Sequence, residues 1–396
     1  MRRKTFKYRM YPTRHQSVLL FQVLFTCKNL YNMMLVDRKN AYDRCGIGLT
    51  YYQQAEQLKY LDLGIYSQVA QDVLRRLDKA FKAFFRRVKN GETPGYPRFK
   101  GYGRYDSFTY PQSGFKILED GRLKLSKIGV IRMFMHREIT GKIKTCTIKR
   151  DGNHWYASFS VEMSDPEPKE INASVGVDVG ITTLATLSDG TEIENPKILD
   201  RFNRNLRRAH RELSRKKTRS HNWYEQKTKL ANIHRTIRNI RNDYLHKVSR
   251  FLVDTYDQII FEDLQITNMV KNHHLAKSIY DASWSTLINF TTYKAEEAGG
   301  VVELVNPRNT SKQCSVCGNI QSMPLSQRTY RCLVCDNVMN RDHNAAINIK
   351  NRYVGTDCVE LTPVETTGYG VAEAGSPIAC SGEEVTYLLT KMNWTS

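Results

Sequence analysis

The sequence contains no stretch of about 18 consecutive apolar residues, which is the length that a membrane-spanning helix needs. The basic start Met1-Arg2-Arg3-Lys4 leads into Thr5-Phe6-Lys7-Tyr8 and not into an apolar segment, so no signal peptide is indicated. Cysteines number only nine and are unevenly placed, which argues against the disulfide framework of a secreted protein. We therefore expect a soluble protein in a reducing cytoplasm, with no membrane partner.

Negative charge is also scarce. The 40 Asp and Glu residues are outnumbered by 60 Lys and Arg residues, which gives a net charge of +20. Because each neutralised phosphate releases counterions, an excess of this size predicts a polyanionic partner, and we expect nucleic acid. A basic protein can also be merely soluble, and it is the clustering of the charge that favours nucleic acid.

Length and composition predict a folded protein of two or three domains, since 396 residues are many for one core and 40% of them are hydrophobic. The N-terminal part is expected to contain one strand in residues 1–13, where apolar residues alternate, and then helices in residues 14–95. A capping box of Thr13 and Gln16 marks the start of the first helix. Short strands in residues 96–170 are expected to form a small β-barrel or sheet.

The chain from 171 to 352 follows the element order of an RNase H-like fold, βββ-β-α-β-α, once two insertions are set aside. Strands are predicted at 174–181, 183–187, 191–193, 258–261 and 301–305, and helices at 278–297 and 341–352. The insertions are a helical one at 196–254 and a cysteine-rich one at 310–340. Residues 353–396, with six acids and one lysine, are expected to form a flexible tail.

Three acids stand where elements of this domain end or begin: Asp178 and Glu262 in apolar strands, and Asp342 at the start of a helix. Hydrolysis of a phosphodiester by two metal ions needs carboxylates that hold the metals about 3.5–4 Å apart, and Mg²⁺ favours such ligands. A single acid at a strand end is more often a turn residue or a cap, so only the combination predicts a catalytic Mg²⁺ site. The glycines that flank Asp178 are expected to let nucleic acid approach, and Asp263 to point away from Glu262.

Four cysteines have the spacing of a two-knuckle zinc ribbon. Cys314 and Cys317 form one Cys-x-x-Cys pair, Cys332 and Cys335 form a second, and 14 residues separate the pairs. Tetrahedral thiolate coordination makes a closed structural site, which would stabilise a short insert with little core of its own. The sequence therefore predicts one structural Zn²⁺ and no catalytic role for it.

Basic residues cluster in two helical segments. Residues 201–250 carry 16 Lys and Arg against 3 Asp and Glu, and a face of this density repels itself unless a polyanion is present. A disordered basic arm is the alternative, but an apolar face along the second half of the segment argues against it. A similar basic face near residues 73–88 could be merely solvated. We expect nucleic-acid contacts from Arg75, Arg76, Arg207, Arg208, Arg211, Arg215, Lys216 and Lys217.

Taken together, these motifs resemble the TnpB family, the RNA-guided nucleases of bacterial and archaeal insertion sequences, which are related to type V CRISPR effectors. The resemblance covers the chain to about residue 352. Besides the four cysteines, it rests on Leu49-Thr50-Tyr51, Gly95-Tyr96-Pro97-Arg98-Phe99-Lys100, Gly176-Val177-Asp178-Val179-Gly180, Tyr244-Leu245-His246-Lys247, Phe261-Glu262-Asp263-Leu264 and Arg341-Asp342-His343-Asn344-Ala345-Ala346.

The resemblance implies a multidomain α/β protein: a small wedge β-barrel interrupted by a helical recognition domain, then an RNase H-like (RuvC) nuclease domain with a zinc-ribbon insertion. It implies that Asp178, Glu262 and Asp342 are catalytic, and that the partners are a guide RNA from the transposon end and double-stranded target DNA. The residues implied to read a short motif beside the target are Tyr51, Gln71 and Thr109. By the same resemblance the protein is prokaryotic and associates with the nucleoid when bound to a target.

Two other functions remain open at the level of sequence. Some relatives of this family have lost the carboxylates and act as RNA-guided repressors, but all three acids are present here. A transposase that acts directly on the ends of its element could also use an RNase H fold, and it would need no guide RNA.

Overall fold

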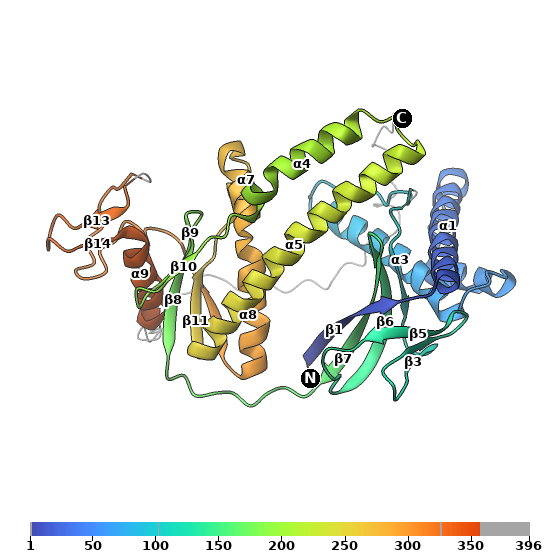
Figure 1. Ribbon diagram of the computed structural model, residues 1–396, viewed down its shortest axis with the longest axis horizontal. Coiled ribbons are helices and arrows are strands. Elements are labelled where there is room, and N and C mark those ends of the chain that lie inside the picture. Colours follow the sequence, from blue (N-terminus) through green and yellow to red (C-terminus); the bar gives the residue numbers. More distant parts are fainter. Residues whose placement is uncertain (1, 102, 325–326, 357–396) are drawn as a thin grey trace, which may run out of the picture. The chain divides into compact units, whose positions relative to one another are not determined.

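The computed structural model describes residues 2–101, 103–324 and 327–356 of the chain. The chain divides into two compact units, the first ending at Ser164 and the second beginning at Asp165 (Figure 1). This division lies a few residues before the boundary expected at 170. Most of the predicted flexible tail, from 357 onward, lies outside the described residues, and residues 353–356 belong to the last helix.

The first unit is built on a curled antiparallel sheet of seven strands, in the order β2-β6-β7-β1-β5-β4-β3. The N-terminal strand lies in its middle, where Phe6, Tyr8 and Met10 point into the core as their alternation predicts. The strands are β1 Arg2–Tyr11, β2 Ser107–Tyr110, β3 Phe115–Ile117, β4 Leu123–Leu125, β5 Gly129–Phe134, β6 Lys142–Asp151 and β7 His154–Met163.

The helices of this unit are α1 Arg14–Cys45, α2 Tyr51–Gln57, the 3-10 helix η1 Leu58–Tyr60 and α3 Ser67–Lys89. The predicted capping box at the start of α1 is present, with Thr13 and Gln16 each bonded to the other's backbone. By length and composition alone, α1 could cross a membrane. Its buried side chains, among them Leu20, Leu24 and Leu30, instead share one core with β1 and α3, which is the packing of a core helix.

The second unit contains a five-stranded sheet in the order β10-β9-β8-β11-β12. Its strands are β8 Ser174–Val179, β9 Thr183–Leu187, β10 Glu192–Glu194, β11 Gln258–Glu262 and β12 Val301–Val305. β8, β11 and β12 are parallel, while β9 and β10 are joined to β8 through antiparallel pairs. The strands match the predicted ones closely, and the RNase H-like arrangement is confirmed.

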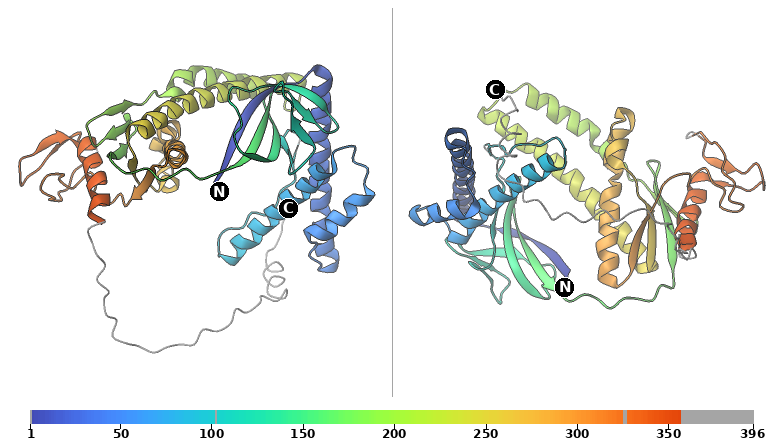
Figure 2. Two further views of the ribbon diagram at one scale, coloured as in Figure 1. Left: turned by 90° about the horizontal axis from the view of Figure 1, so that it is seen from below. Right: turned by 180° about the vertical axis from the view of Figure 1, so that it is seen from behind.

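Helices cover both faces of this sheet because side chains alternate along β11. Ile259 and Phe261 point into a core shared with α5 and α8, whereas Ile260 packs with Ile349 of α9 on the opposite face. Figures 1 and 2 show α9 on one side of the sheet and α5 and α8 on the other. The helices are α4 Ile198–Ser214, α5 His221–Thr255, α6 Ile266–Met269, α7 His273–Ala282, α8 Trp284–Ala298 and α9 Arg341–Thr356.

The single helix predicted at 278–297 is wrong in one respect, because α7 and α8 meet at a break. Ser283 has a φ of 54°, a left-handed conformation that ends α7. After it, the Trp284 indole donates a hydrogen bond to the carbonyl of Gly180, 3.0 Å away, which ties the start of α8 to the end of β8.

Candidate active site

The carboxyl ends of two parallel strands bring the first two predicted site acids together. Val177 of β8 lies opposite Phe261 of β11, so Asp178 and Glu262 follow them at the same end of neighbouring strands. Ligands of α/β sheets bind beyond this end. Asp342 is the second residue of α9, which packs directly on β8. All three acids therefore lie near one another at the carboxyl ends of the inner strands β8 and β11.

The Asp178 carboxyl is surrounded by conditions that disfavour its charge. Burial raises its pKa well above the usual value, and the carboxylates of Glu262 and Asp342 raise it further, while Arg341 and Arg328 oppose them more weakly. Gathered carboxylates are unfavourable unless a cation is present or a proton is bound. This concentration of negative charge suits a divalent cation.

Glu262 is held in place by a hydroxyl. Its side chain is only 8% exposed, and Thr310 Oγ1 donates a hydrogen bond to its Oε1 over 2.5 Å. Burial raises the pKa of Glu262, and the bond from Thr310 and the charge of Arg352 counter that rise. Asp263, the neighbour expected to point away from Glu262, lies beyond the end of β11 and is exposed.

Asp342 is held by arginines. Arg328 Nη1 lies 3.3 Å from one carboxylate oxygen and Arg341 Nη2 lies 3.5 Å from the other. Arg328 also donates to the hydroxyl of Thr182, 3.4 Å away. Asn340 accepts from the backbone N–H of Asp342 and so caps α9. Among the described residues, the four cysteines are the only group of three or more whose metal-ligating atoms all lie within 4.8 Å of one another, so the three carboxylates do not all come that close.

Thr310 and Arg328 were not found from the sequence. Both lie in the irregular segments around the cysteines, where no periodicity or motif distinguishes them from other polar residues. Thr310 is 48 residues from Glu262, and Arg328 is 146 residues from Thr182, so only the fold brings these pairs together.

The glycines that flank Asp178, which were expected to let nucleic acid approach, make room for the protein's own backbone. A Cβ on Gly176 would lie 2.1 Å from the carbonyl oxygen of Ala346, because α9 crosses β8 at this point. A Cβ on Gly180 would lie 2.7 Å from the carbonyl oxygen of Thr183. Gly176 thus permits the close contact that places α9, and with it Asp342, beside the strand.

The four predicted zinc ligands converge. The Sγ atoms of Cys314 and Cys335 are 3.7 Å apart, those of Cys317 and Cys332 are 3.5 Å apart, and all four lie within 4.8 Å of one another. Two short strands, β13 Thr329–Arg331 and β14 Val338–Asn340, support the second pair. Backbone N–H groups of Cys335 and Val334 lower the pKa of Cys332 to about 6, which favours its thiolate. This donor set fits one tetrahedral Zn²⁺.

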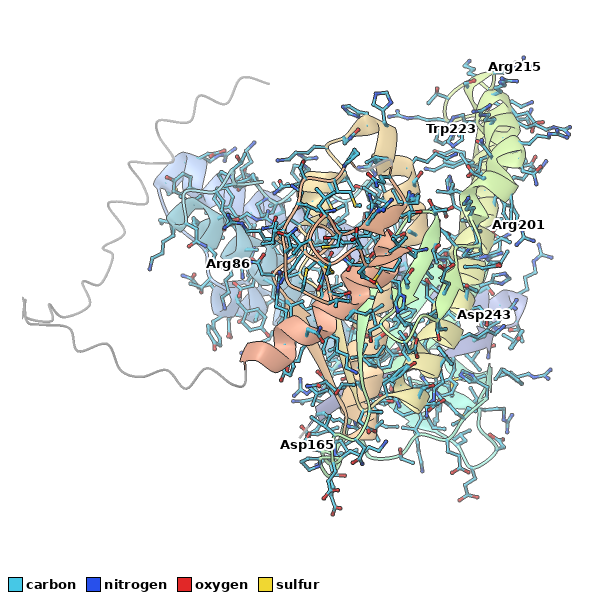
Figure 3. All side chains as sticks on the ribbon, turned by 90° about the vertical axis from the view of Figure 1, so that its left-hand side faces the viewer. Arg86, Asp165, Arg201, Arg215, Trp223 and Asp243 are labelled. Atoms are coloured by element: carbon cyan, nitrogen blue, oxygen red, sulfur yellow. The ribbon has the colours of Figure 1, made fainter. Side chains whose placement is uncertain are left out.

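The basic insert forms a helical hairpin, and the alternative of a disordered arm is wrong. α4 and α5 pack through a small apolar core that includes Leu206, Leu230 and Ile237, and residues 215–220 form the turn between them. Figure 3 shows α4 extending from Arg201 to Arg215 at the tip of the hairpin. A hollow of about 800 Å³ on α4 is lined by Arg204, Arg207, Arg208, Arg211 and Arg215, with Asp200, Asn203 and Glu212.

The remaining predicted nucleic-acid contacts lie together in the first unit. Tyr51 begins α2, and Arg75 of α3 donates to its hydroxyl over 3.4 Å. Gln71 is exposed on α3, one turn before Arg75. Thr109 of β2 accepts a hydrogen bond of 2.8 Å from Arg76.

Arg76 has a structural role that the sequence did not indicate. Its guanidinium pairs with Asp72 at 2.8 Å and donates to Ser107 and Thr109, which joins α3 to β2. The Thr109 hydroxyl also lies 2.9 Å from that of Thr147. Arg76 therefore fixes the position of Thr109 from within the protein, whereas Arg75 is exposed.

Three family models match the chain. One described as "Probable transposase" (OrfB of IS605) matches residues 158–273, the Cas12f1-like TNB domain matches 284–349, and a "Helix-turn-helix domain" matches 1–46. The last description does not fit the structure, since residues 2–45 form the strand β1 followed by the single helix α1.

Curated relatives match along most of the chain. The "Putative RNA-guided DNA endonuclease InsQ" of Escherichia coli K12 is 34% identical over 375 residues, which cover 88% of this chain and 92% of the relative. A "Putative RNA-guided DNA endonuclease" of Streptomyces pristinaespiralis is 33% identical over 363 residues, and 88% of each chain is covered.

A solved structure supports the fold. The cryo-EM structure of the Cas12f1-sgRNA-target DNA complex matches with a TM-score of 0.58 at 14% identity, covering 89% of this chain and 99% of that one. The fold and the site thus define a RuvC-type protein with a zinc-ribbon-like insertion. More particularly, the chain belongs to the TnpB family, the OrfB family of IS605-type elements.

Proposed function

We propose that this protein is an RNA-guided DNA endonuclease. The observation that carries the proposal is the arrangement of Asp178, Glu262 and Asp342 at one edge of an RNase H-like sheet. The relatives named above are described as RNA-guided DNA endonucleases, and the matching Cas12f1 structure is a complex with sgRNA and target DNA. The net charge of +20 fits a protein that holds both nucleic acids.

The three carboxylates fit Mg²⁺, because Glu262 and Asp342 raise the cost of charging Asp178 and only a cation or a proton relieves it. Bound there, two Mg²⁺ ions would activate the attacking water and stabilise the leaving oxygen of the phosphodiester. Asp178, Glu262 and Asp342 would hold the metals, and Thr310 would keep Glu262 oriented toward them. The four cysteines would hold a structural Zn²⁺ that stabilises the ribbon next to α9.

The nucleic-acid contacts follow from the same proposal. Pairing with a guide RNA from the transposon end would read the target sequence, while the protein reads a short adjacent motif and the backbone of the heteroduplex. Tyr51, Gln71 and Thr109 are the proposed readers of that motif. Phosphates would be contacted by Arg75 and by the hairpin residues Arg207, Arg208, Arg211, Arg215, Lys216 and Lys217. The protein would act in the cytoplasm, where its target is nucleoid DNA.

The test expresses the protein together with the flanking ends of its element, then sequences the RNA that co-purifies. We expect one structured transcript whose 3′ or 5′ end varies in sequence and can therefore serve as a guide. The purified complex should cut a plasmid that carries the matching sequence and leave a mismatched plasmid intact. Guided binding without cutting would favour the repressor, and cutting at element ends without RNA would favour the transposase.

A further inference from the structure

A pocket in the first unit has no part in the proposed contacts. It has a volume of about 320 Å³, within the range of small-ligand sites. Its lining comes from the end of β1, the first turns of α1 and the β6–β7 hairpin. Figure 1 labels these elements. Its lining includes Arg9, Tyr11, Phe21, Arg150, His154 and Trp155, and no lining residue is an acid.

Guanidinium groups lie close to aromatic rings in this pocket. The Arg150 guanidinium lies 4.4 Å from the centre of the Phe21 ring, and the Trp155 ring meets Phe21 edge-on with centres 5.4 Å apart. Arg9 lies 5.0 Å from the centre of the Tyr11 ring and donates to His154 Nδ1 over 2.8 Å. These contacts fix the planes of the side chains, so the surfaces are formed before any ligand arrives.

Two aromatic rings of the lining are also exposed to solvent, although the first unit has a hydrophobic core in which they could be buried. Phe21 is 41% exposed on α1 and Tyr11 is 45% exposed at the end of β1. Flat aromatic and guanidinium surfaces stack on nucleobases, and nearby arginines attract phosphate. With two arginines and no carboxylate in its lining, the pocket has the chemistry of a nucleotide site.

We propose that this pocket binds one unpaired nucleotide of the guide RNA, its base stacked on the Phe21–Arg150 pair and its phosphate near Arg9. The assignment rests on the proposed function for the source of the RNA. A pocket of this size takes a single base that has left its stack, and such bases are presented by the loops and bulges of structured RNA. The side chains of Ser17 and Asn153 supply polar groups for the ribose hydroxyls.

The experiment measures the affinity of purified protein for the co-purifying RNA by filter binding. Phe21→Ala should weaken binding about 5- to 100-fold, which is the effect of removing one stacking partner. Phe25→Ala is the matched control, because Phe25 lies one turn farther along α1, is 55% exposed and is outside the pocket. It should stay within about twofold of the wild type. If Phe21→Ala fails to fold by circular dichroism, Phe21→Leu keeps the apolar volume and removes the ring.

A second variant tests the guanidinium plane. Arg150→Lys keeps the charge but removes the flat surface, so it should also weaken binding, whereas a purely electrostatic role would leave affinity unchanged. Equal RNA affinity in the wild type, Phe21→Ala and Arg150→Lys would refute the assignment of the pocket to RNA binding but leave the proposed function standing. A defect seen only in the binding of DNA by the guide-loaded complex would overturn the assignment to RNA. A wild type that binds no RNA would overturn the proposed function and, with it, this assignment.

Discussion

Among single residues, Asp178 links the proposed chemistry to stability. Burial and its two acidic neighbours raise its pKa, so the folded chain binds a proton at this position more tightly than the unfolded chain does. The stability contributed by that proton is present at acid pH and is lost as the pH rises from the usual Asp range toward the raised pKa. At neutral pH without Mg²⁺, the carboxyl at this position therefore disfavours folding.

We expect Asp178→Asn to raise the melting temperature by a few degrees at pH 7 in buffer without added Mg²⁺. The gain should shrink toward pH 4, where the wild-type carboxyl is protonated as well. Thermal denaturation across this pH range measures it, and chelators are avoided because they would also remove zinc. Asp263→Asn, at the exposed neighbour of Glu262, is the control and should change little. A lower melting temperature for Asp178→Asn at pH 7 would contradict the clustering of charge.

The residues of the site differ in how far the sequence reveals them. Asp178, Glu262 and Asp342 could be predicted because each stands at the boundary of a periodic element. Thr310 and Arg328 could not be predicted, because no local pattern marks them. Thr310 is 48 residues from its partner Glu262, and Arg328 is 14 residues from Asp342 and 146 from Thr182. Arg76 looked like a member of an exposed basic face, yet its guanidinium is used inside the protein by Asp72 and Thr109.

Among the elements, the crossing of α9 over β8 sets the geometry of the site. Gly176 leaves no room for a side chain between the strand and the backbone of α9. Such a close approach is invisible in the sequence, where a glycine within a strand can equally indicate a bulge or an approaching ligand. The strands of the five-stranded sheet were predictable from their periodicity, whereas the short β13 and β14 of the cysteine segment were not. The break at Ser283 was missed because a non-glycine residue in the left-handed region leaves no pattern.

Gly176→Ala should displace α9 and with it Asp342. We expect the free energy of unfolding to fall by about 3 kcal/mol or more, at the upper end of overpacking effects, together with a large reduction of cleavage. Gly48→Ala is the control, because a Cβ there meets no atom within 4 Å. Urea denaturation of both variants measures the difference. A Gly176→Ala protein with wild-type stability and cleavage would show that the crossing is not as tight as described.

The zinc ribbon is the second element with a direct test. The purified protein should contain one zinc per chain by elemental analysis, and Cys332→Ser should release it, because one missing thiolate opens the tetrahedral site. Cys45→Ser, at an exposed cysteine outside the cluster, should keep its zinc. A zinc content near zero in fully active wild-type protein would refute the assignment.

On the scale of the whole molecule, much of the excess positive charge lies on helices that extend from the nuclease fold. The run of basic residues at 201–250 predicted this, and the α4–α5 hairpin presents them on an ordered support. The surface along which a guide RNA would bind could not be predicted from the sequence, because it depends on which basic segments lie on the same side of the folded chain.

Neutralising Arg215, Lys216 and Lys217 at the tip of the hairpin should weaken binding of every guide RNA alike. The slope of log affinity against log salt should fall by up to about 0.9 for each phosphate that the variant no longer neutralises. The matched control neutralises Lys59, Arg122 and Lys247, three exposed cations that already pair with acids, and should change the slope less. Titrations between low and physiological salt decide between phosphate binding and mere solvation. Equal slopes for both triple variants would mean that the hairpin tip does not touch phosphate.

Asp178, Glu262 and Asp342 are proposed to form one catalytic site, and Asp178→Ala tests this central claim most directly. The guide-bound wild type and variant are incubated with Mg²⁺ and DNA that carries the target and its adjacent motif, and both cutting and binding are measured. We predict that Asp178→Ala binds the target within a few-fold of the wild type but cuts it roughly 10⁴-fold more slowly or below detection, because the acids act as a unit. Asp263→Ala should cut normally. Equal cutting by the wild type and Asp178→Ala would contradict the site proposed for this protein.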